Sequence, residues 1–372
     1  MSQSEAEPEK SAAQKLHTVF LYLSIPFAVI CGIVAVVLYT NHTVEPAHAS
    51  LAISGMTAFA SSVLTIFLIY GHLTAYTNPV EQRLIIRILL LCPIYAIDSF
   101  VALKWYQYAT VVNLIRDTYE SYVIYMFFRL MVGYIGGEKM VLNLWSKEKQ
   151  SMPHPFPMCC LPELKLNKRT LSVWKVCLLQ YMVLNPILTL VSLPLYFARH
   201  DGKRIYDEKE VSASSVYVWF SAIKFISVTF AFTSLVYFYL GCKDFLTAHK
   251  PLGKFASIKI VVFLSFWQTV LLGALNHFKV IPNRGNWTSD EIATGLGNFV
   301  LCIEMYLIAV AHRWIFEDTP YVPAHGRYPL KCDRIKHAFG LGDVVDDTKE
   351  TIALLTPVSL GSPFSKNAAE TA

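Results

Sequence analysis

Four charged residues lie inside long apolar stretches of this sequence: Asp98, Arg116, Asp117 and Glu120. Charges are costly in hydrocarbon, so they usually face a bundle interior or a water-filled cavity. Residues four apart on a helix can pair, as Arg116 and Glu120 would. The chemistry within reach is charge pairing, binding of a polar solute or relay of a proton. The alternative is that these groups only hold two helices in register.

Four further polar residues fall near the middle of other apolar stretches: Asn185, Lys224, Gln268 and Glu304. At a rise of about 1.5 Å per residue, they lie at similar depths if those stretches are helices. The sequence therefore predicts a polar layer through a helix bundle. A lone mid-span lysine needs a counter-ion, and Glu304 or Asp98 is the expected partner of Lys224.

The charges of this predicted layer bear on what it could bind. Its ionisable members are four acids and two bases, so their charges sum to −2 if all are ionised. Such a layer is poorly suited to an organic anion. Either some carboxylates carry a proton, or the solute is neutral or cationic.

The chain around these residues has the composition of a polytopic membrane protein. Of its 372 residues 54% are hydrophobic and 16% are charged, against roughly 25% charged in a soluble domain. Only helices or closed barrels satisfy the backbone in lipid, and apolar runs of about 20 residues favour an all-α bundle. The expected spans are residues 16–39, 49–70, 84–103, 111–135, 173–197, 213–240, 256–278 and 291–312.

The segments between the spans complete the predicted organisation. We expect a disordered terminus over residues 1–15, an extra membrane helix over 16–39 and a membrane core over 49–316 that contains a long loop at 136–172. A tail over 317–372 would carry an amphipathic helix at 333–355. Lys and Arg are concentrated in the loops on the side of both termini, which predicts that both termini are cytosolic. The glycosylation sequons at Asn41 and Asn286 fall on the opposite side.

The cysteines and sequence motifs do not indicate an enzyme. The eight cysteines include no CxxC pair, and neither a metal site nor a cofactor is expected. HExxH, GxSxG, P-loop and dinucleotide fingerprints are not found in the sequence. The net charge of +5 does not indicate nucleic-acid binding, because the basic residues sit in particular loops. The adjacent Cys159 and Cys160 are either candidates for S-acylation or unmodified thiols.

Several separated motifs resemble the organic solute transporter alpha / transmembrane protein 184 family. They are PIYAIDSF (93–100), RDTYESYVIY (116–125), YIGGE (134–138), the Cys-Cys loop, FLSFWQ (263–268) and CIEM (302–305). The resemblance covers roughly residues 49–316 and implies a seven-helix bundle, to which 16–39 would be an added helix. Where many relatives have Lys-Pro or Arg-Pro, this chain has Asn185-Pro186. A substrate role that depends on that cation is therefore not implied here.

The resemblance also implies a function. Some members of the family move bile acids and steroid conjugates with a single-span partner subunit. Fungal and plant relatives resemble vacuolar or endomembrane proteins, some of them linked to autophagy through the tail, and the motifs here are nearer to this branch. We expect a gradient-driven transporter for small amphipathic solutes. The alternative is a scaffold that recruits autophagy or trafficking proteins through its tail.

The expected surroundings follow from the same reading. The chain would lie in the lipid bilayer of a vacuole or endosome, with the plasma membrane as the alternative. Its expected partners are a small amphipathic solute, a cytosolic trafficking protein, and a second copy of the chain or a single-span subunit.

Overall fold

The computed structural model describes residues 46–154, 162–200, 203–206, 215–246, 251–282, 288–324 and 326–355, together with Val19, Tyr22 and Pro26. The predicted leading span therefore lies almost entirely outside the described residues. Four predicted modification sites also lie outside them: Cys159, Cys160, Asn41 and Asn286.

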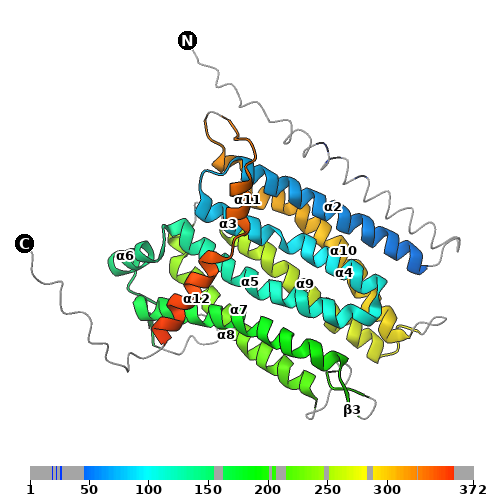
Figure 1. Cartoon of the computed structure of the whole chain (residues 1–372). Helices are drawn as coiled ribbons and strands as arrows, with labels where there is room; N and C mark the ends of the chain where they lie inside the picture. Colours follow the sequence, from blue (N-terminus) through cyan, green and yellow to red (C-terminus); the bar gives the residue numbers. More distant parts are fainter. Residues whose placement is uncertain are drawn as a thin grey trace, which may run out of the picture. The chain divides into compact units, whose positions relative to one another are not determined.

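Long helices dominate the described chain and run back and forth between two ends of a bundle (Figure 1). Within the part of the chain that the structure describes, five stretches are long and apolar enough to cross a membrane: His48–Thr74, Pro79–Lys104, Lys168–Phe197, Val216–Leu246 and Ser289–Ile315. The predicted all-α polytopic membrane bundle is confirmed. The long elements are α2 (Pro46–Thr74), α3 (Pro79–Leu89), α4 (Leu91–Lys104), α5 (Ala109–Ile135), α7 (Lys168–Phe197), α8 (Val216–Leu246), α9 (Pro251–His277) and α10 (Ser289–Ile315).

Short elements join or follow the long helices. They are η1 (Tyr106–Tyr108), α6 (Glu138–Glu148), η3 (Thr319–Tyr321), α11 (Cys332–Phe339), α12 (Gly342–Leu355), and two antiparallel hairpins that pair β1 (Ser151–Met152) with β2 (Leu164–Lys165) and β3 (Arg199–His200) with β4 (Lys203–Arg204). We call the end of the bundle where α2, α5 and α10 finish the tail end. It is the end predicted to be cytosolic.

The predicted span over residues 84–103 is two helices that meet at Leu90. Pro93 explains the break, because proline has no N–H and its ring clashes with the carbonyl of the residue four before it, here Leu89. Asn78 caps the start of α3 by accepting a hydrogen bond from the Glu81 amide at 3.4 Å. Helix α5 ends as the sequence predicted, at Gly136, whose φ of 99° suits glycine.

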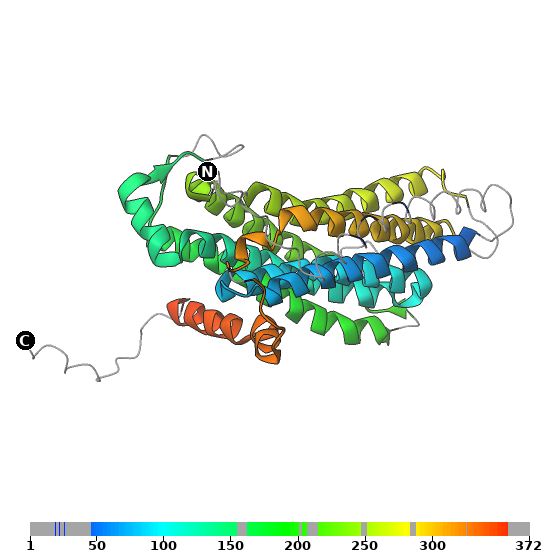
Figure 2. The ribbon, with the colours of Figure 1, turned by 90° about the horizontal axis from the view of Figure 1, so that it is seen from above.

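The helices pack in an order that places α4 and α5 in the middle of the bundle. Helices α2, α4 and α10 pack against one another, and α5 lies between α4 and α7. Helix α8 packs on α7, and α9 packs on α10 (Figure 2). Aromatic rings fill the interior, as where Phe128 and Phe238 meet edge to face at 4.9 Å.

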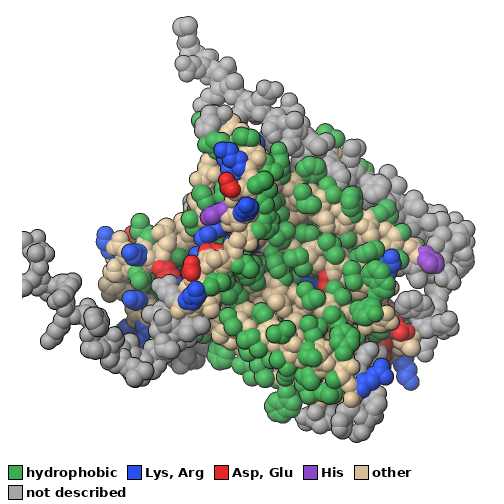
Figure 3. Space-filling model, in the orientation of Figure 1, with side chains coloured by type: hydrophobic (Ala, Val, Ile, Leu, Met, Phe, Trp, Pro, Cys, Tyr) green, Lys and Arg blue, Asp and Glu red, His purple; other side chains and the backbone are tan. Residues whose placement is uncertain are grey.

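The outer faces of the helices are apolar, as a lipid environment requires. Leu190, Phe225 and Phe230 are 72%, 69% and 59% exposed. Figure 3 shows hydrophobic side chains over the middle of one face and charged side chains toward the ends of the helices. Contiguous apolar surface of this extent marks contact with a membrane or a partner rather than with water.

The predicted tail helix over residues 333–355 is also two helices, α11 and α12. Gly340 lies between α11 and α12. Glycine is unfavourable in a helix interior, which explains the interruption. Helix α11 packs against α3. Residues 340–372 form a compact unit of their own, which contains α12.

Candidate functional site

The short connection through η1 brings the predicted charges of α4 and α5 together. The Arg116 guanidinium lies 3.3 Å from the Asp98 carboxylate, from Nη1 to Oδ2. Its Nη2 lies 3.6 Å from Oδ1 of Asp117. Asp98 is only 5% exposed. A guanidinium is suited to this position because its planar fork can serve two carboxylates at once.

Lys224 extends this group to α8, with a partner that the sequence did not predict. Its Nζ lies 3.8 Å from Oδ2 of Asp117. The expectation that Lys224 pairs with Glu304 or Asp98 was wrong. The physical reason is packing: α8 lies against α7 and α5, whereas Glu304 stands on α10, which packs with α2, α4 and α9. We call Asp98, Arg116, Asp117 and Lys224 the charge chain.

Glu120 is held by a residue that sequence reasoning missed. The Tyr95 hydroxyl donates a hydrogen bond of 2.6 Å to Glu120 Oε2. The Tyr95 ring also lies 5.1 Å from the Arg116 guanidinium, a cation–π distance. Arg116 forms ion pairs with Asp98 and Asp117, and its pairing with Glu120 stays a prediction. Tyr95 belongs to the PIYAIDSF motif, which was the available signal.

Helix α7 contributes polar side chains to the same region. Asn185 Nδ2 donates to the Asp117 carbonyl at 2.6 Å, and Thr189, one turn further, donates to the Leu114 carbonyl at 3.3 Å. Thr118 donates to Thr189 at 3.0 Å. Residues 185 and 189 are four apart and therefore share one face of α7. Asn185 thus joins the predicted group through the α5 backbone.

The remaining two predicted residues form a separate pair. Gln268 of α9 donates a hydrogen bond to Glu304 of α10. The predicted layer is therefore divided between two interfaces, one around α5 and one between α9 and α10.

Some buried polar atoms around the charge chain have no hydrogen-bond partner among the described residues. They are Oδ1 of Asn113, Nε of Arg116 and Oδ1 of Asn185. Buried polar atoms are nearly always paired with protein or water, so unpaired ones need an explanation. A site that receives a polar solute or water provides one.

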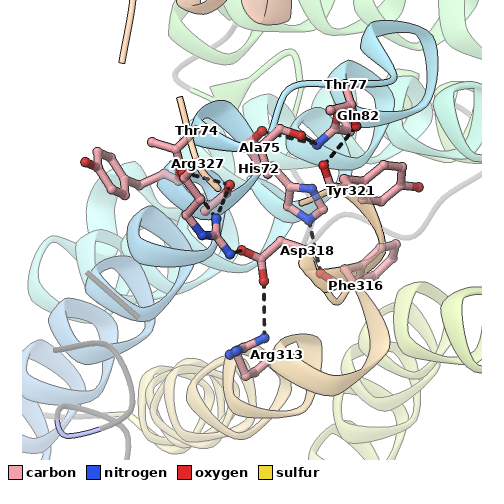
Figure 4. A network of polar contacts seen from close by, with 12 residues as sticks. His72, Thr74, Ala75, Thr77, Gln82, Arg313, Phe316, Asp318, Tyr321 and Arg327 are labelled. Carbon is pink, nitrogen blue, oxygen red and sulfur yellow. Dashed lines mark hydrogen bonds and ion pairs between the residues drawn. The ribbon is translucent and has the colours of Figure 1, made fainter. Parts of the chain in front are cut away.

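A second polar network, at the tail end, was not predicted from the sequence (Figure 4). Asp318 follows α10 and is 3% exposed. Its carboxylate lies 2.6 Å from Arg327 and 3.5 Å from Arg313. Arg327 also donates to the Gly71 carbonyl at 2.7 Å, and His72 Nε2 lies 3.1 Å from the Phe316 carbonyl. The segment after the last span is therefore fixed to the end of α2.

The electrostatics of Asp318 follow from these neighbours. Burial by itself raises the pKa of a carboxyl, but the nearby Arg327, His72 and Arg313 outweigh it and hold the pKa of Asp318 below its usual value. In the part of the chain that the structure describes, no group of three or more His, Cys, Asp or Glu residues could hold a metal ion.

The fold and this site define a multi-pass helical membrane protein with a charge chain across three of its helices. Residues 50–321 match the model of the family described as organic solute transporter Ostalpha. The chain belongs to this family. It is a multi-pass integral membrane protein, and the predicted family resemblance is confirmed.

The chain is also similar to a transmembrane protein 184 homolog from Dictyostelium discoideum. The two are 34% identical over 274 residues, which is 73% of this chain and 53% of the relative. The chain thus spans about half the length of that curated relative. No solved structure matches the chain significantly.

Proposed function

We propose that the protein moves small amphipathic organic solutes across its membrane, driven by a gradient, and that the charge chain lies on their pathway. The observation that carries the proposal is the set of unpaired buried polar atoms on Asn113, Arg116 and Asn185. Arg116 is itself part of the line of charges that crosses from α4 through α5 to α8, Asn185 bonds to the Asp117 carbonyl, and Asn113 lies one helical turn before Asp117. Charged groups inside a membrane commonly mark solute or ion pathways.

The charge balance supports neutral or cationic solutes. Within the charge chain, the two carboxylates balance the two cations. The two further carboxyls, Glu120 and Glu304, receive hydrogen bonds from the neutral donors Tyr95 and Gln268. An organic anion would meet this surplus of acidic groups and would be disfavoured.

The gradient dependence rests on the position of the charges in the membrane. A charge that crosses the membrane field gains or loses about 2.3 kcal/mol per 100 mV. A cationic solute, or a proton carried with a neutral one, would respond to this field. We therefore expect uptake to depend on an imposed potential or pH difference.

Transport in reconstituted vesicles tests the proposal directly. A neutral steroid, its sulfate conjugate and a cationic amphiphile would be offered under an imposed gradient. We expect the neutral or cationic solute to enter faster than the sulfate. Lys224→Met removes the α8 end of the charge chain, and we expect the initial rate to fall about tenfold, a factor that corresponds to about 1.4 kcal/mol.

A matched control distinguishes the loss of a charge in the charge chain from the loss of any lysine charge on α8. Lys243→Met removes an exposed lysine from the tail end of the same helix, and we expect the rate to stay unchanged. The proposal fails if wild-type vesicles take up none of the three solutes. It also fails if Lys224→Met transports like the wild type.

A second candidate function is a scaffold for trafficking or autophagy proteins. The observation in its favour is that residues 340–372 form a separate compact unit, in which the exposed Leu341 and Val345 present apolar side chains. Proteins captured from cells by the full-length chain would be compared with those captured by a Leu341→Ser/Val345→Ser variant. Identical captured sets would rule out this surface.

A further inference from the structure

Four elements meet around Tyr321 at the tail end. The Tyr321 hydroxyl donates to Glu81 Oε2 of α3 at 2.8 Å, and Thr77 donates to the Tyr321 carbonyl at 2.9 Å. The side chain of Tyr321 also interacts electrostatically with that of Tyr134, which lies near the end of α5. Lys254 of α9 donates to the same Tyr134 hydroxyl at 2.6 Å.

These contacts form a line of polar groups from Lys254 through Tyr134 and Tyr321 to Glu81. A protonated lysine can only donate, so Tyr134 accepts from Lys254. Tyr321 in turn donates to Glu81. The line starts at a cation and ends at a carboxylate, and such charge-assisted bonds are the stronger kind. It ties together the tail ends of α3, α5 and α9, three helices that belong to different parts of the bundle.

The segment that carries Tyr321 is itself locked in place. We call the described residues 316–324 and 326–327 the strap. Asp318 holds the strap through Arg313 and Arg327, and Arg327 binds the Gly71 carbonyl of α2 (Figure 4). The close approach needs glycine, because a Cβ at position 71 would lie 3.1 Å from the Asp318 carboxyl carbon.

We propose that the strap is the tail-end gate of the solute pathway. Tyr321 closes this end by linking α3, α5 and α9, and Asp318 holds the closed position on α2. The inference rests on the proposed function, because only a protein with a pathway needs a gate. Transporters work by closing one side of a central site while the other opens. Here the charge chain at Asp117 lies 17 residues from Tyr134 along α5, about 26 Å away at the rise of a helix.

The alternative is that the strap is an inert cap on the helix ends. An inert cap contributes to stability but does not control access of water to the bundle interior. Access is therefore the property to measure. Ser121 is a suitable reporter, because it is 1% exposed and lies one helical turn from Asp117 on the tail side. Its hydroxyl bonds to the Thr118 carbonyl of its own helix, so a cysteine is a small change there.

The experiment measures the rate at which a charged, membrane-impermeant thiol reagent modifies Ser121→Cys in the full-length protein in vesicles. The reagent is applied on the side to which the C-terminal segment is exposed, and the rate without Ser121→Cys is subtracted. We expect Tyr321→Phe, which removes the hydroxyl and keeps the ring, to raise the rate about fivefold. That factor corresponds to loss of one net hydrogen bond of about 1 kcal/mol. Glu81→Gln weakens the same link from the α3 side, so it replaces Tyr321→Phe as the test if Tyr321→Phe folds poorly.

Tyr76→Phe is the matched control, because Tyr76 makes a tail-end hydrogen bond of 2.9 Å to His337 outside this line. Its rate should equal that of the parent. The gate is overturned if the folded Tyr321→Phe and Glu81→Gln variants react like the parent, or if Tyr76→Phe reacts equally fast. Vesicles that transport none of the solutes but show the expected thiol rates would sink the proposed function, and would leave only the finding that the strap controls access of water to the bundle interior.

Discussion

Asp117 of α5 lies between two cations, 3.6 Å from Arg116 of its own helix and 3.8 Å from Lys224 of α8. Its side chain is 39% exposed, whereas that of Asp98 at the other end of the charge chain is 4% exposed. Asp117 is therefore the more accessible of the two carboxylates, and the one at which we expect the proposed solute to bind. A solute that competes for Lys224 would loosen the contact between α5 and α8, which couples binding to helix movement.

The pairing of Lys224 with Asp117 predicts coupled effects of mutation. Lys224→Met and Asp117→Asn should each lower the free energy of unfolding by about 1 kcal/mol, and the double variant should lose less than the sum. The partial exposure of the pair keeps the values below those of a fully buried pair. Thermal unfolding in detergent measures all three variants. Additive losses would show that the two side chains do not interact in solution.

Arg116 should not be replaceable by lysine. Its guanidinium contacts Asp98 and Asp117 at the same time and stacks near Tyr95. An ammonium is a point charge that cannot reproduce a planar fork, so Arg116→Lys should cost about 1–2 kcal/mol of unfolding free energy. Arg169→Lys, at an exposed position near the start of α7, should cost less than about 0.5 kcal/mol. Equal stability of both variants would contradict the bridging role.

The fold class was predictable from the sequence because lipid leaves few choices. Runs of apolar residues longer than a span, with polar loops between them, specify helices. The break at Leu90 was less visible. Pro93 lies inside the predicted span over residues 84–103, but whether the chain bends or restarts at a proline depends on packing of α3 against α5, which no local pattern records.

The candidate site was predicted in its members but not in its pairings. Depth along a span follows from residue number, so the charges at 98, 116 and 117 were placed at one level. Rotation about a helix axis and the identity of the neighbouring helix do not follow from residue number. That is why Lys224 was assigned to Glu304 or Asp98 rather than to Asp117. The strap was missed because Tyr321 and Arg327 reach partners 240 and 256 residues away in sequence.

Gly71 and Gly273 should respond in opposite directions to the same substitution. A Cβ at position 71 would press on the Asp318 carboxyl group, so Gly71→Ala should destabilise the protein by about 1–3 kcal/mol. No described atom lies within 4 Å of a Cβ at position 273 in α9. Gly273→Ala should therefore be neutral or stabilising by up to about 1 kcal/mol, because alanine is the better helix former. Thermal unfolding of the two variants in detergent distinguishes them, and a similar loss in both would disprove the close packing of the strap on α2.

The strap should lose its hold in acid. Burial alone would raise the pKa of Asp318, but its arginine and histidine neighbours outweigh this effect and lower the pKa below its ordinary value in the folded state. A group with a lowered folded pKa stabilises the protein above its unfolded pKa, and this contribution disappears as the pH falls through the folded pKa. The difference in unfolding free energy between wild type and Asp318→Asn should therefore be constant from pH 7 to about pH 5 and shrink below about pH 4.

Asp333→Asn, at an exposed position on α11, shows what loss of any carboxylate does, and its difference from wild type should stay near zero. A difference for Asp318→Asn that grows as the pH falls would show that the carboxyl is stabilised in its protonated form, and the ion pairs with Arg327 and Arg313 would then not hold the strap.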